Sequence, residues 1–223
     1  MNITYRLASL AIVLAVAQTS LAVTVDMTSG TAGTAHPGQS FNETRGVTAT
    51  LLGSVDLNLL SMRLDEFTIG LAPGGTVGAR VYADTGTLIA SADRQVAQGA
   101  DQSITIPISA TLTAGSTYRF AFFISNGIDG GSGAMFDPDP QGAFGFSYVD
   151  SSGLFRFADV RADPGDIFPT TPNIFVPRMF LEAQPVPEPA LLWLVLGGLT
   201  GLAVVFRKRS SVAPLNGNFE SGV

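Results

Sequence analysis

The sequence contains no cysteine among its 223 residues and only one histidine, His36. The chain therefore has no thiol nucleophile, no thiolate metal site and no disulfide. His36 has no second histidine with which to share a metal ion, and it lies in the turn-like segment 34–38. The Gly-x-Ser-x-Gly motif that positions the nucleophile of serine hydrolases does not occur. The most similar segment is Gly131-Ser132-Gly133. We therefore expect a protein that is not an enzyme.

Positive charge is scarce between the two ends of the chain. Residues 23–184 hold eight of the 12 basic side chains, all of them arginine, and 16 of the 18 acidic ones, a net charge of −8. Nucleic acids and anionic lipids bind to basic patches, so we expect neither as a partner of this region. The composition fits a solvated domain outside the cytoplasm.

The first long apolar run belongs to a predicted secretory signal peptide, residues 1–22. Arg6 precedes the apolar stretch 7–17, and small residues follow at Ser20 and Ala22. Signal peptidase reads this order of a positive start, an apolar centre and a small-residue site. We expect cleavage after Ala22, with signal peptidase as a partner, because the run is too short to favour an uncleaved anchor.

The second long apolar run lies near the C-terminus and is flanked by two unlike segments. A proline strip precedes it, and its 17 residues, 190–206, carry no charge before a basic triplet follows. Proline favours extended backbone, so the strip should be exposed and not helical. A helix of 17 residues just reaches across a thin bilayer, with the basic triplet on the cytoplasmic side. The flanking residues are Val186, Pro187, Glu188 and Pro189 in the strip and Arg207, Lys208 and Arg209 in the triplet.

This order of motif, apolar helix and basic end resembles the PEP-CTERM sorting signal of Gram-negative bacteria, over residues 185–209. The resemblance implies recognition and cleavage by a membrane protease of the exosortase type, whose chemistry belongs to that partner. It also implies a host that commonly makes exopolysaccharide. The short tail 210–223 departs from the family pattern, in which chains usually end soon after the basic cluster. The alternative is an ordinary tail anchor in the inner-membrane lipid after a proline-rich linker.

Residues 23–184 are predicted to form one all-β domain, an antiparallel β-sandwich of jelly-roll-like type. Short runs of β-branched and aromatic residues alternate there with Gly, Pro, Asp and Asn, and helical periodicity is nearly absent. Many short strands with frequent turns favour a sandwich. The predicted strands are residues 23–27, 46–52, 56–60, 62–69, 76–82, 88–92, 102–108, 117–124, 144–149, 154–159 and 174–183.

Three local patterns support this architecture. Isoleucines alternate through 103–108, which places them on one face, and Pro107 marks an edge strand or a bulge. Asp84 and Gly86 are hairpin-turn residues. Residues 112–118 have the spacing of a tyrosine corner, in which the Tyr118 phenol bonds to the backbone of a nearby loop. We expect further loops at 127–145 and 163–172 and a linker at 183–189.

The stretch 77–123 also resembles a broad group of exported bacterial β-sandwich domains. The matching residues are Ala79-Arg80-Val81-Tyr82, then Leu88-Ile89-Ala90-Ser91, then 112–118. This resemblance supports the fold and says little about function, because one fold hosts many functions.

Two features of the domain are candidates for ligand binding. Asp129, Asp137 and Asp139 lie in a glycine-bearing segment and supply the oxygen ligands that Ca²⁺ prefers, although their spacing matches no EF-hand and Asp also favours turns. Aromatic residues are numerous, and we expect most of them in the core. An exposed subset could stack on sugar rings, but residues 23–184 contain no tryptophan.

The sequence thus predicts a non-enzymatic envelope or extracellular-matrix protein without a cofactor, linked to exopolysaccharide or biofilm. The body would be exported to the periplasm, held by its C-terminal helix and then displayed at the cell surface or released. The alternative is a carbohydrate-binding module, in which Ca²⁺ could take part. A row of exposed aromatic side chains would favour that alternative, and a buried aromatic set would favour the first.

Overall fold

The structure is a computed structural model that describes residues 21–28, 34–36, 39–129, 135–137, 147–173 and 176–186. Only the backbone is described at 34–36, 39–41, 128–129 and 135–137. The described residues belong to one unit, Leu21–Val186. Within that part of the chain all regular elements are strands, and there is no helix of the length and apolar character that a bilayer span requires. The predicted apolar helix 190–206 and most of the predicted signal peptide lie outside the described residues.

All but three of the described strands form two antiparallel layers. Layer 1 has the order β1-β14-β4-β7 and layer 2 the order β10-β11-β3-β8-β5-β6; β12 adds to β11. The other three form a separate sheet of order β13-β9-β2. The layers join at one end, where β4 pairs with β8 at Thr68–Ile128 and Ile69–Gly127. The strands are β1 (Val23–Asp26), β2 (Thr34–His36), β3 (Gln39–Leu51), β4 (Leu57–Ile69), β5 (Gly75–Ala83), β6 (Leu88–Val96), β7 (Gly99–Leu112), β8 (Thr117–Asp129), β9 (Met135–Asp137), β10 (Ser147–Val149), β11 (Phe155–Pro164), β12 (Pro172–Asn173), β13 (Val176–Pro177) and β14 (Met179–Pro185).

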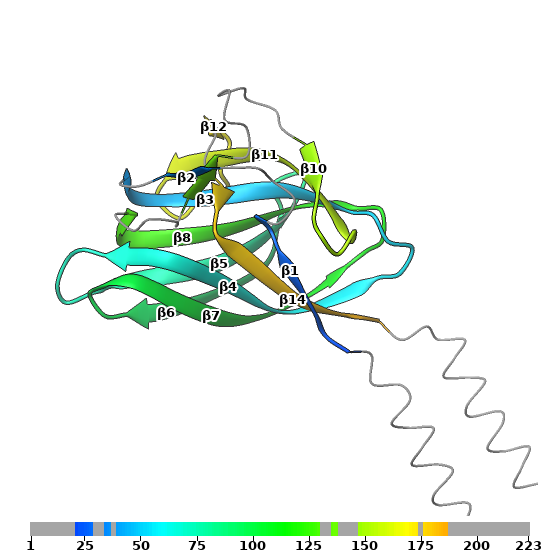
Figure 1. The fold of residues 1–223 in the computed structure, drawn as a ribbon, viewed down its shortest axis with the longest axis horizontal. Coiled ribbons are helices and arrows are strands. Elements are labelled where there is room, and N and C mark those ends of the chain that lie inside the picture. Colours follow the sequence, from blue (N-terminus) through cyan, green and yellow to red (C-terminus); the bar gives the residue numbers. More distant parts are fainter. Residues whose placement is uncertain are drawn as a thin grey trace, which may run out of the picture. The chain divides into compact units, whose positions relative to one another are not determined.

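The connections between these strands are those of a jelly roll. In chain order, β1, β3, β4, β5, β6, β7, β8 and β14 lie in layers 1, 2, 1, 2, 2, 1, 2 and 1. The layer orders β1-β14-β4-β7 and β3-β8-β5-β6 are therefore the two four-stranded sheets of that fold. Figure 1 shows β1 and β14 side by side, as their antiparallel pairing requires. The predicted all-β, jelly-roll-like sandwich is confirmed.

The core lies between the two layers and takes every second side chain from most strands. In β7, Ile104, Ile106 and Ile108 are buried while the residues between them are exposed, as the alternation predicts. Phenylalanines from layer 2 fill the centre. The Phe155 ring lies edge-on to Phe120, with ring centroids 5.9 Å apart, and stacks on Phe157 at 6.0 Å. Such pairs add to the stabilisation that burial of apolar area provides.

The local predictions on edges and turns are confirmed. β7 pairs only with β4 among the described strands, and Pro107 lies opposite Ser61 where the register shifts, so it occupies both an edge and a bulge. The turn between β5 and β6 closes through hydrogen bonds from the Gly86 amide to the Ala83 carbonyl and from the Ala83 amide to the Thr87 carbonyl. Gly86 has φ of 89°, which glycine adopts without strain.

The tyrosine corner is also confirmed. The Thr113 amide donates to the Tyr118 hydroxyl oxygen at 2.6 Å, and the Tyr118 side chain is buried. The same turn bonds to two other segments, because the Gly115 amide donates to the Leu51 carbonyl and the Ala114 amide donates to the Asp56 carboxylate. The corner therefore fixes the β7–β8 connection against the ends of β3 and β4.

Replacing Tyr118 by phenylalanine should lower the free energy of unfolding by about 1–2 kcal/mol, because the Thr113 amide loses its acceptor. Urea denaturation monitored by circular dichroism measures the change. Ser109→Ala, which removes an exposed hydroxyl from β7, is the control and should change stability by less than about 0.5 kcal/mol. Equal stability of Tyr118→Phe and wild type would show that the bond contributes nothing.

Two strand predictions need correction. Residues 56–60 and 62–69 form one strand, β4, because a bulge between Leu59 and Ser61 shifts the register without ending the pairing. The predicted strand 174–183 is instead divided, since β13 and β14 lie in two different sheets. The predicted strand 144–149 is described only at β10, which pairs with β11.

The predicted linker at 183–189 is wrong over its first part. β14 continues to Pro185, which lies opposite Leu57, and the Val186 amide donates to the Asp56 carbonyl at 2.8 Å. Val186 is half-buried, contrary to the prediction of an exposed strip beginning there. Proline cannot donate a backbone hydrogen bond, so it is expected to interrupt strand pairing. Pro185 is the last residue of β14, a position where a strand tolerates proline. Residues 187–189 lie outside the described residues.

Candidate functional site

The most elaborate polar cluster covers the outer face of layer 2. The connection from β11 to β12, residues 165–171, crosses this face, and we call it the strap. Its first residue is fixed to β3, because the Gly165 amide donates to the Asn42 carbonyl and the Thr44 hydroxyl donates to the Gly165 carbonyl. Gly165 has φ of 80°, a value suited to glycine at the point where the chain leaves β11.

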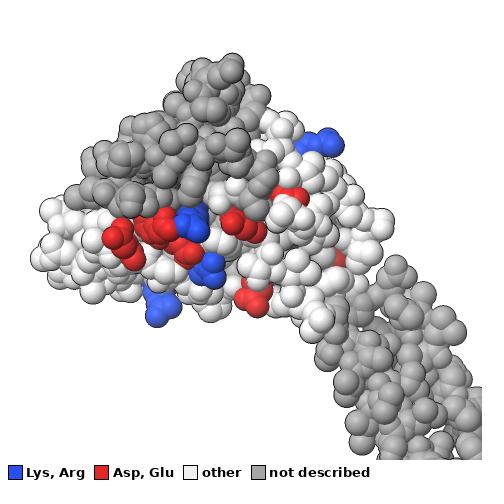
Figure 2. Space-filling view, viewed as in Figure 1, with Lys and Arg blue, Asp and Glu red and all other residues white. Residues whose placement is uncertain are grey.

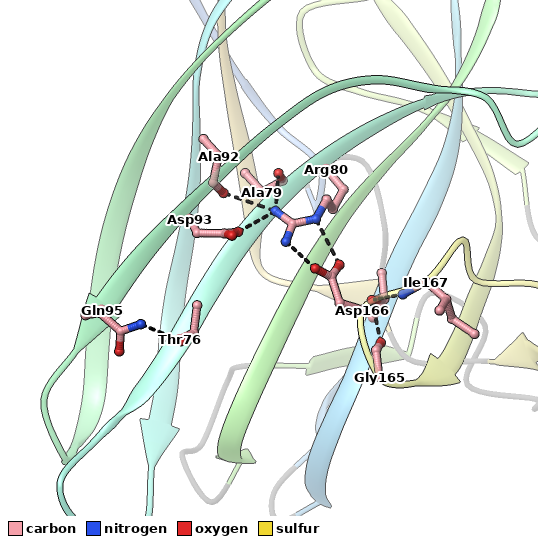
Figure 3. Close-up of polar contacts among 10 residues, drawn as sticks. Thr76, Ala79, Arg80, Ala92, Asp93, Gln95, Gly165, Asp166 and Ile167 are labelled. Carbon is pink, nitrogen blue, oxygen red and sulfur yellow. Dashed lines mark hydrogen bonds and ion pairs between the residues drawn. The ribbon is translucent and has the colours of Figure 1, made fainter.

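A buried arginine of β5 is the centre of this cluster. Arg80 is 4% exposed and points away from the core, since its neighbours Ala79 and Val81 are the core residues of β5. Asp166 of the strap binds its guanidinium in a fork, with Nε–Oδ1 at 2.9 Å and Nη2–Oδ2 at 2.5 Å. Asp93 of β6 binds Nη1 at 2.6 Å. Figure 3 shows the two carboxylates on different sides of the guanidinium.

Main-chain oxygens complete the coordination of Arg80. Nη1 also donates to the carbonyls of Ala79 and Ala92, at 3.0 and 3.2 Å. A Cβ at Gly78 would lie 2.6 Å from Nη1 and 2.5 Å from the Asp93 carboxylate. Glycine at position 78 therefore leaves the space that the guanidinium occupies.

A second buried arginine lies on the neighbouring strand β8. Arg119 stands opposite Tyr82 in the pairing of β5 with β8. Its guanidinium donates to the Thr48 hydroxyl and to the Pro169 carbonyl of the strap. The Phe168 ring of the strap covers it at 4.7 Å and meets Tyr82 edge-on at 5.1 Å. A strap carboxylate, aromatic ring and carbonyl thus contact two buried arginines.

Burial and partners move the pKa values of these groups in different directions. Burial alone would lower the pKa of Arg80, but the hydrogen bonds and charges of Asp166 and Asp93 raise it above its ordinary value. Burial lowers the pKa of Arg119, against the opposing charge of Asp159. Burial also raises the pKa of Tyr82. Both arginines stay charged at neutral pH.

Asp163 fixes the far end of the strap. Its carboxylate accepts hydrogen bonds from the amides and hydroxyls of both Thr170 and Thr171. Desolvation alone would raise its pKa, but these four hydrogen bonds lower it to about 2. The carboxylate is therefore the form that the folded chain favours.

The sign of the pH effect follows from this lowered pKa. A folded pKa of about 2, below the ordinary value of 3.8, means that Asp163 stabilises the fold fully above about pH 4. The stabilisation is lost as the pH falls from about 4 towards 2. The difference in free energy of unfolding between wild type and Asp163→Asn should therefore be constant above about pH 4 and shrink below it. An NMR titration with an Asp163 midpoint near 4 would contradict this assignment.

A shallow hollow of about 60 Å³ lies on the outer face of layer 1. Arg63, one of its lining residues, has its Nε 3.0 Å from the Asp65 carboxylate, and Arg178, which is bound to Glu66, lies 6.0 Å from the ring of another lining residue, Phe180. The Arg63 guanidinium covers the Phe180 ring at 3.9 Å. Figure 2 shows charged side chains of both signs gathered together on one part of the visible face. The hollow is lined by Thr24, Ser61, Arg63, Thr105, Phe180, Leu181 and Glu182.

The sequence-predicted ligand residues are only partly described. His36 ends β2, a strand rather than a turn, and its side chain is not described. The side chains of Asp129 and Asp137 are likewise not described, and Asp139 and the segment Gly131-Ser132-Gly133 lie outside the described residues. Among the described residues, no group of three or more His, Asp or Glu side chains is placed to hold a metal ion.

The described aromatic side chains are buried or half-buried. Phe155 is fully buried, and Tyr148 is half-buried, with its hydroxyl bonded to the Met27 carbonyl. Phe136 and Phe144 are not described at the side-chain level. The exposed large apolar residues of the described part are all aliphatic. The described surface therefore presents no row of aromatic rings on which sugars could stack.

The sequence did not single out Arg80, Arg119, Asp166 or Phe168 as one cluster. Asp166 lies 86 positions from Arg80, so no local pattern joins them. The alternation of Arg80 and Tyr82 with Ala79 and Val81 places both side chains on the outer face of the predicted strand 76–82, but it does not identify their partners.

Comparisons with known proteins give little further information. No family model matches the chain, and no curated protein matches it. The structure of infectious bursal disease virus Gx strain is 14% identical over 87% of this chain and 50% of its own, with a TM-score of 0.27. A VP2 mutant of the same virus in T=1 particles is 13% identical over 86% of this chain and 48% of its own, also at 0.27. The chain spans about half of each, and no argument rests on these likenesses.

Proposed function

We propose that the chain is a non-enzymatic exported protein, a jelly-roll body that is sorted through its C-terminal signal. The observation that carries the proposal is the order of segments at the end of the body. Strand pairing continues to Val186, and the motif Pro187-Glu188-Pro189, an apolar run and a basic triplet follow at once in the sequence. A folded body followed directly by these segments suits a precursor held in the inner membrane with its body in the periplasm.

The geometry of the body supports a structural role. The strap closes over Arg80 and Arg119, so the largest polar cluster of the described surface has its charges balanced within the fold. The described aromatic residues are buried or covered. Such a body would serve as a stable surface or matrix module after release, in an envelope that carries exopolysaccharide. Signal peptidase and an exosortase-type protease would be its processing partners.

The double substitution Glu188→Ala/Pro189→Ala should abolish processing. The full-length chain is then expected to accumulate in the inner membrane, because the extended motif that the protease reads is gone. Cell fractionation with an antibody against the body measures this. The control is Asn218→Ala in the tail. Unchanged processing of the double variant would identify the segment as an ordinary anchor and end the sorting proposal.

A second candidate function, carbohydrate binding, is favoured by the hollow on layer 1. Its lining combines the hydroxyls of Thr24, Ser61 and Thr105 with the charged groups of Arg63 and Glu182, which are typical partners of sugar hydroxyls. A volume of about 60 Å³ is room for about two waters, so only part of a sugar ring would enter. Binding would therefore be shallow.

Glycan-array binding by the exported protein tests this candidate, with and without Ca²⁺. If the hollow binds sugar, Glu182→Gln should weaken binding about tenfold, while Asp84→Asn in the β5–β6 turn should leave it unchanged. Sugar binding that requires Ca²⁺ would indicate a binding site that includes the candidate Ca²⁺ ligands Asp129, Asp137 and Asp139. Absence of binding in both conditions would exclude the candidate.

A further inference from the structure

The last residues of the sandwich are paired right up to the predicted sorting motif. Gln184 lies opposite Asn58 and Pro185 opposite Leu57 in β4, and the Val186 amide donates to the Asp56 carbonyl. We call residues 184–186 the β14 end. The next residue in the sequence is Pro187, the first of the motif. No unpaired residue therefore separates the folded strand from the motif.

A protease needs more backbone than the motif itself provides. Substrate segments usually bind as extended strands whose main-chain N–H and C=O groups bond to the enzyme over several residues. In the β14 end, Gln184 and Pro185 are paired with β4, the Val186 amide is already bonded to the Asp56 carbonyl, and Pro185 has no N–H to donate. The same backbone cannot pair with β4 and with a protease at once, so binding around the motif competes with the edge of the fold.

We propose that the β14 end controls processing, because its pairing with β4 withholds the backbone beside the motif and cleavage proceeds only from a frayed state. The inference rests on the proposed sorting function and adds a regulatory element to it. The rate of processing then follows the population of the open β14 end, as proteolysis does when opening and closing are fast.

The structure limits this opening to a short segment. Leu181 and Ala183, just before the β14 end, are buried in the core, so they hold the strand in place. Pairing with β1 reaches only to Ala183, opposite Val23. A register shift between Glu182 and Ala183 lies one residue before the β14 end. The three residues beyond are half-buried and can leave β4 without exposing the core.

A disulfide across the β14 end tests the proposal directly. Asn58 and Gln184 are opposite each other and half-buried, and opposite residues of antiparallel strands have Cα atoms about 4.5–5.5 Å apart, within disulfide range. The chain has no cysteine, so Asn58→Cys/Gln184→Cys introduces the only pair. Oxidised, this variant should be processed at least about tenfold more slowly than wild type in the processing host, and reductant should restore the rate.

The matched control is a disulfide that leaves the β14 end untouched. Thr76 and Gln95 are opposite residues of the β5–β6 hairpin. Thr76→Cys/Gln95→Cys should be processed at the wild-type rate in both redox states. Thermal melts of both variants establish that each is folded, so a slow rate cannot be attributed to misfolding.

A linker gives the opposite test. Insertion of Gly-Ser-Gly-Ser between Val186 and Pro187 supplies unpaired backbone while the body and the motif stay intact. Processing should then become about three- to tenfold faster, because fraying of a terminal strand is no longer required. The double variant with both linker and Asn58–Gln184 disulfide should also be fast, since the linker removes the dependence on the β14 end.

The outcomes separate this inference from the function on which it rests. If Glu188→Ala/Pro189→Ala abolishes processing but neither the disulfide nor the linker changes the rate, control by the β14 end is wrong and sorting stands. If the motif variant is processed normally, the sorting function is wrong and the inference falls with it. A slow disulfide variant together with a fast linker variant supports both.

Discussion

Replacing Arg80 by alanine is expected to lower the free energy of unfolding by about 3 kcal/mol, at the low end of the cost of breaking a buried ion pair. The substitution leaves the carboxylates of Asp93 and Asp166 without their shared cation and removes the donor to the Ala79 and Ala92 carbonyls. The Asp93 and Asp166 side chains are 56% and 40% exposed, so water screens them and keeps the cost from being larger. Chemical denaturation measures the change.

Arg80→Lys is the informative control for this prediction. Lysine keeps the charge but cannot bind Asp166 in a fork, so its loss of stability should be intermediate. Hydrogen exchange of the strap amides should rise in both variants, because Asp166 holds the strap to β5. A change below about 1 kcal/mol in Arg80→Ala would show that the strap is held by Phe168 and Asp163 instead.

Replacing Phe155 by alanine should cost about 4 kcal/mol, the typical value for removing a fully buried phenylalanine. The ring lies between Phe120 and Phe157, and β3 pairs with this end of β11. The cavity would therefore open in the core between the layers, next to β11 and β3, where paired neighbouring strands cannot close it. Urea denaturation at neutral pH gives the magnitude.

Phe155→Leu is the matched control, since it preserves most of the apolar volume and should cost about 1–1.5 kcal/mol. If alanine and leucine destabilised the protein equally, the effect would come from lost ring contacts rather than from a cavity. A cost near zero for alanine would mean that this part of the core can collapse around the missing ring, which the dense aromatic packing does not allow.

The sequence predicts this fold well where the signal is local. The alternating isoleucines of 103–108, the turn at Asp84 and Gly86 and the corner at Tyr118 each depend on a few neighbouring residues, and each is confirmed. Local patterns of this kind fix the face of a strand and the position of a turn. They do not determine which strands pair, which here follows from the connections between the two layers.

The sequence predicts less where distant residues decide the outcome. Asp166 reaches Arg80 only because the strap crosses layer 2, and Pro185 is paired only because β4 lies beside it. Considered alone, the proline residues predict a loop at 163–172 and a linker at 183–189. In the structure they stand at the end of a strand and in a strap that tertiary contacts hold.

Bulges are the other feature that the sequence conceals. Four residues adopt positive φ without being glycine, at 57° for Glu66, Asn126 and Asp159 and 48° for Asp101. Each lies where a strand register shifts. Asp and Asn tolerate this conformation, but Glu seldom adopts it. The bulge that joins 56–60 to 62–69 in one strand is not marked by a glycine either.

The proposed sorting motif follows directly in the sequence after the last strand of the body, β14. Val23, the residue expected after signal cleavage, pairs with Ala183, three residues before Val186. Both proposed processing positions thus adjoin the same pair of strands, β1 and β14, within one layer of the sandwich.

The intact mass of the protein recovered from outside the producing cells tests the central claim most directly. We expect a chain that begins at Val23 and lacks the apolar segment 190–206 together with everything after it. Terminal peptides from a digest would locate both ends. A recovered protein that retains residues 190–206, or one that is found only as the full-length chain in the inner membrane, would contradict the account.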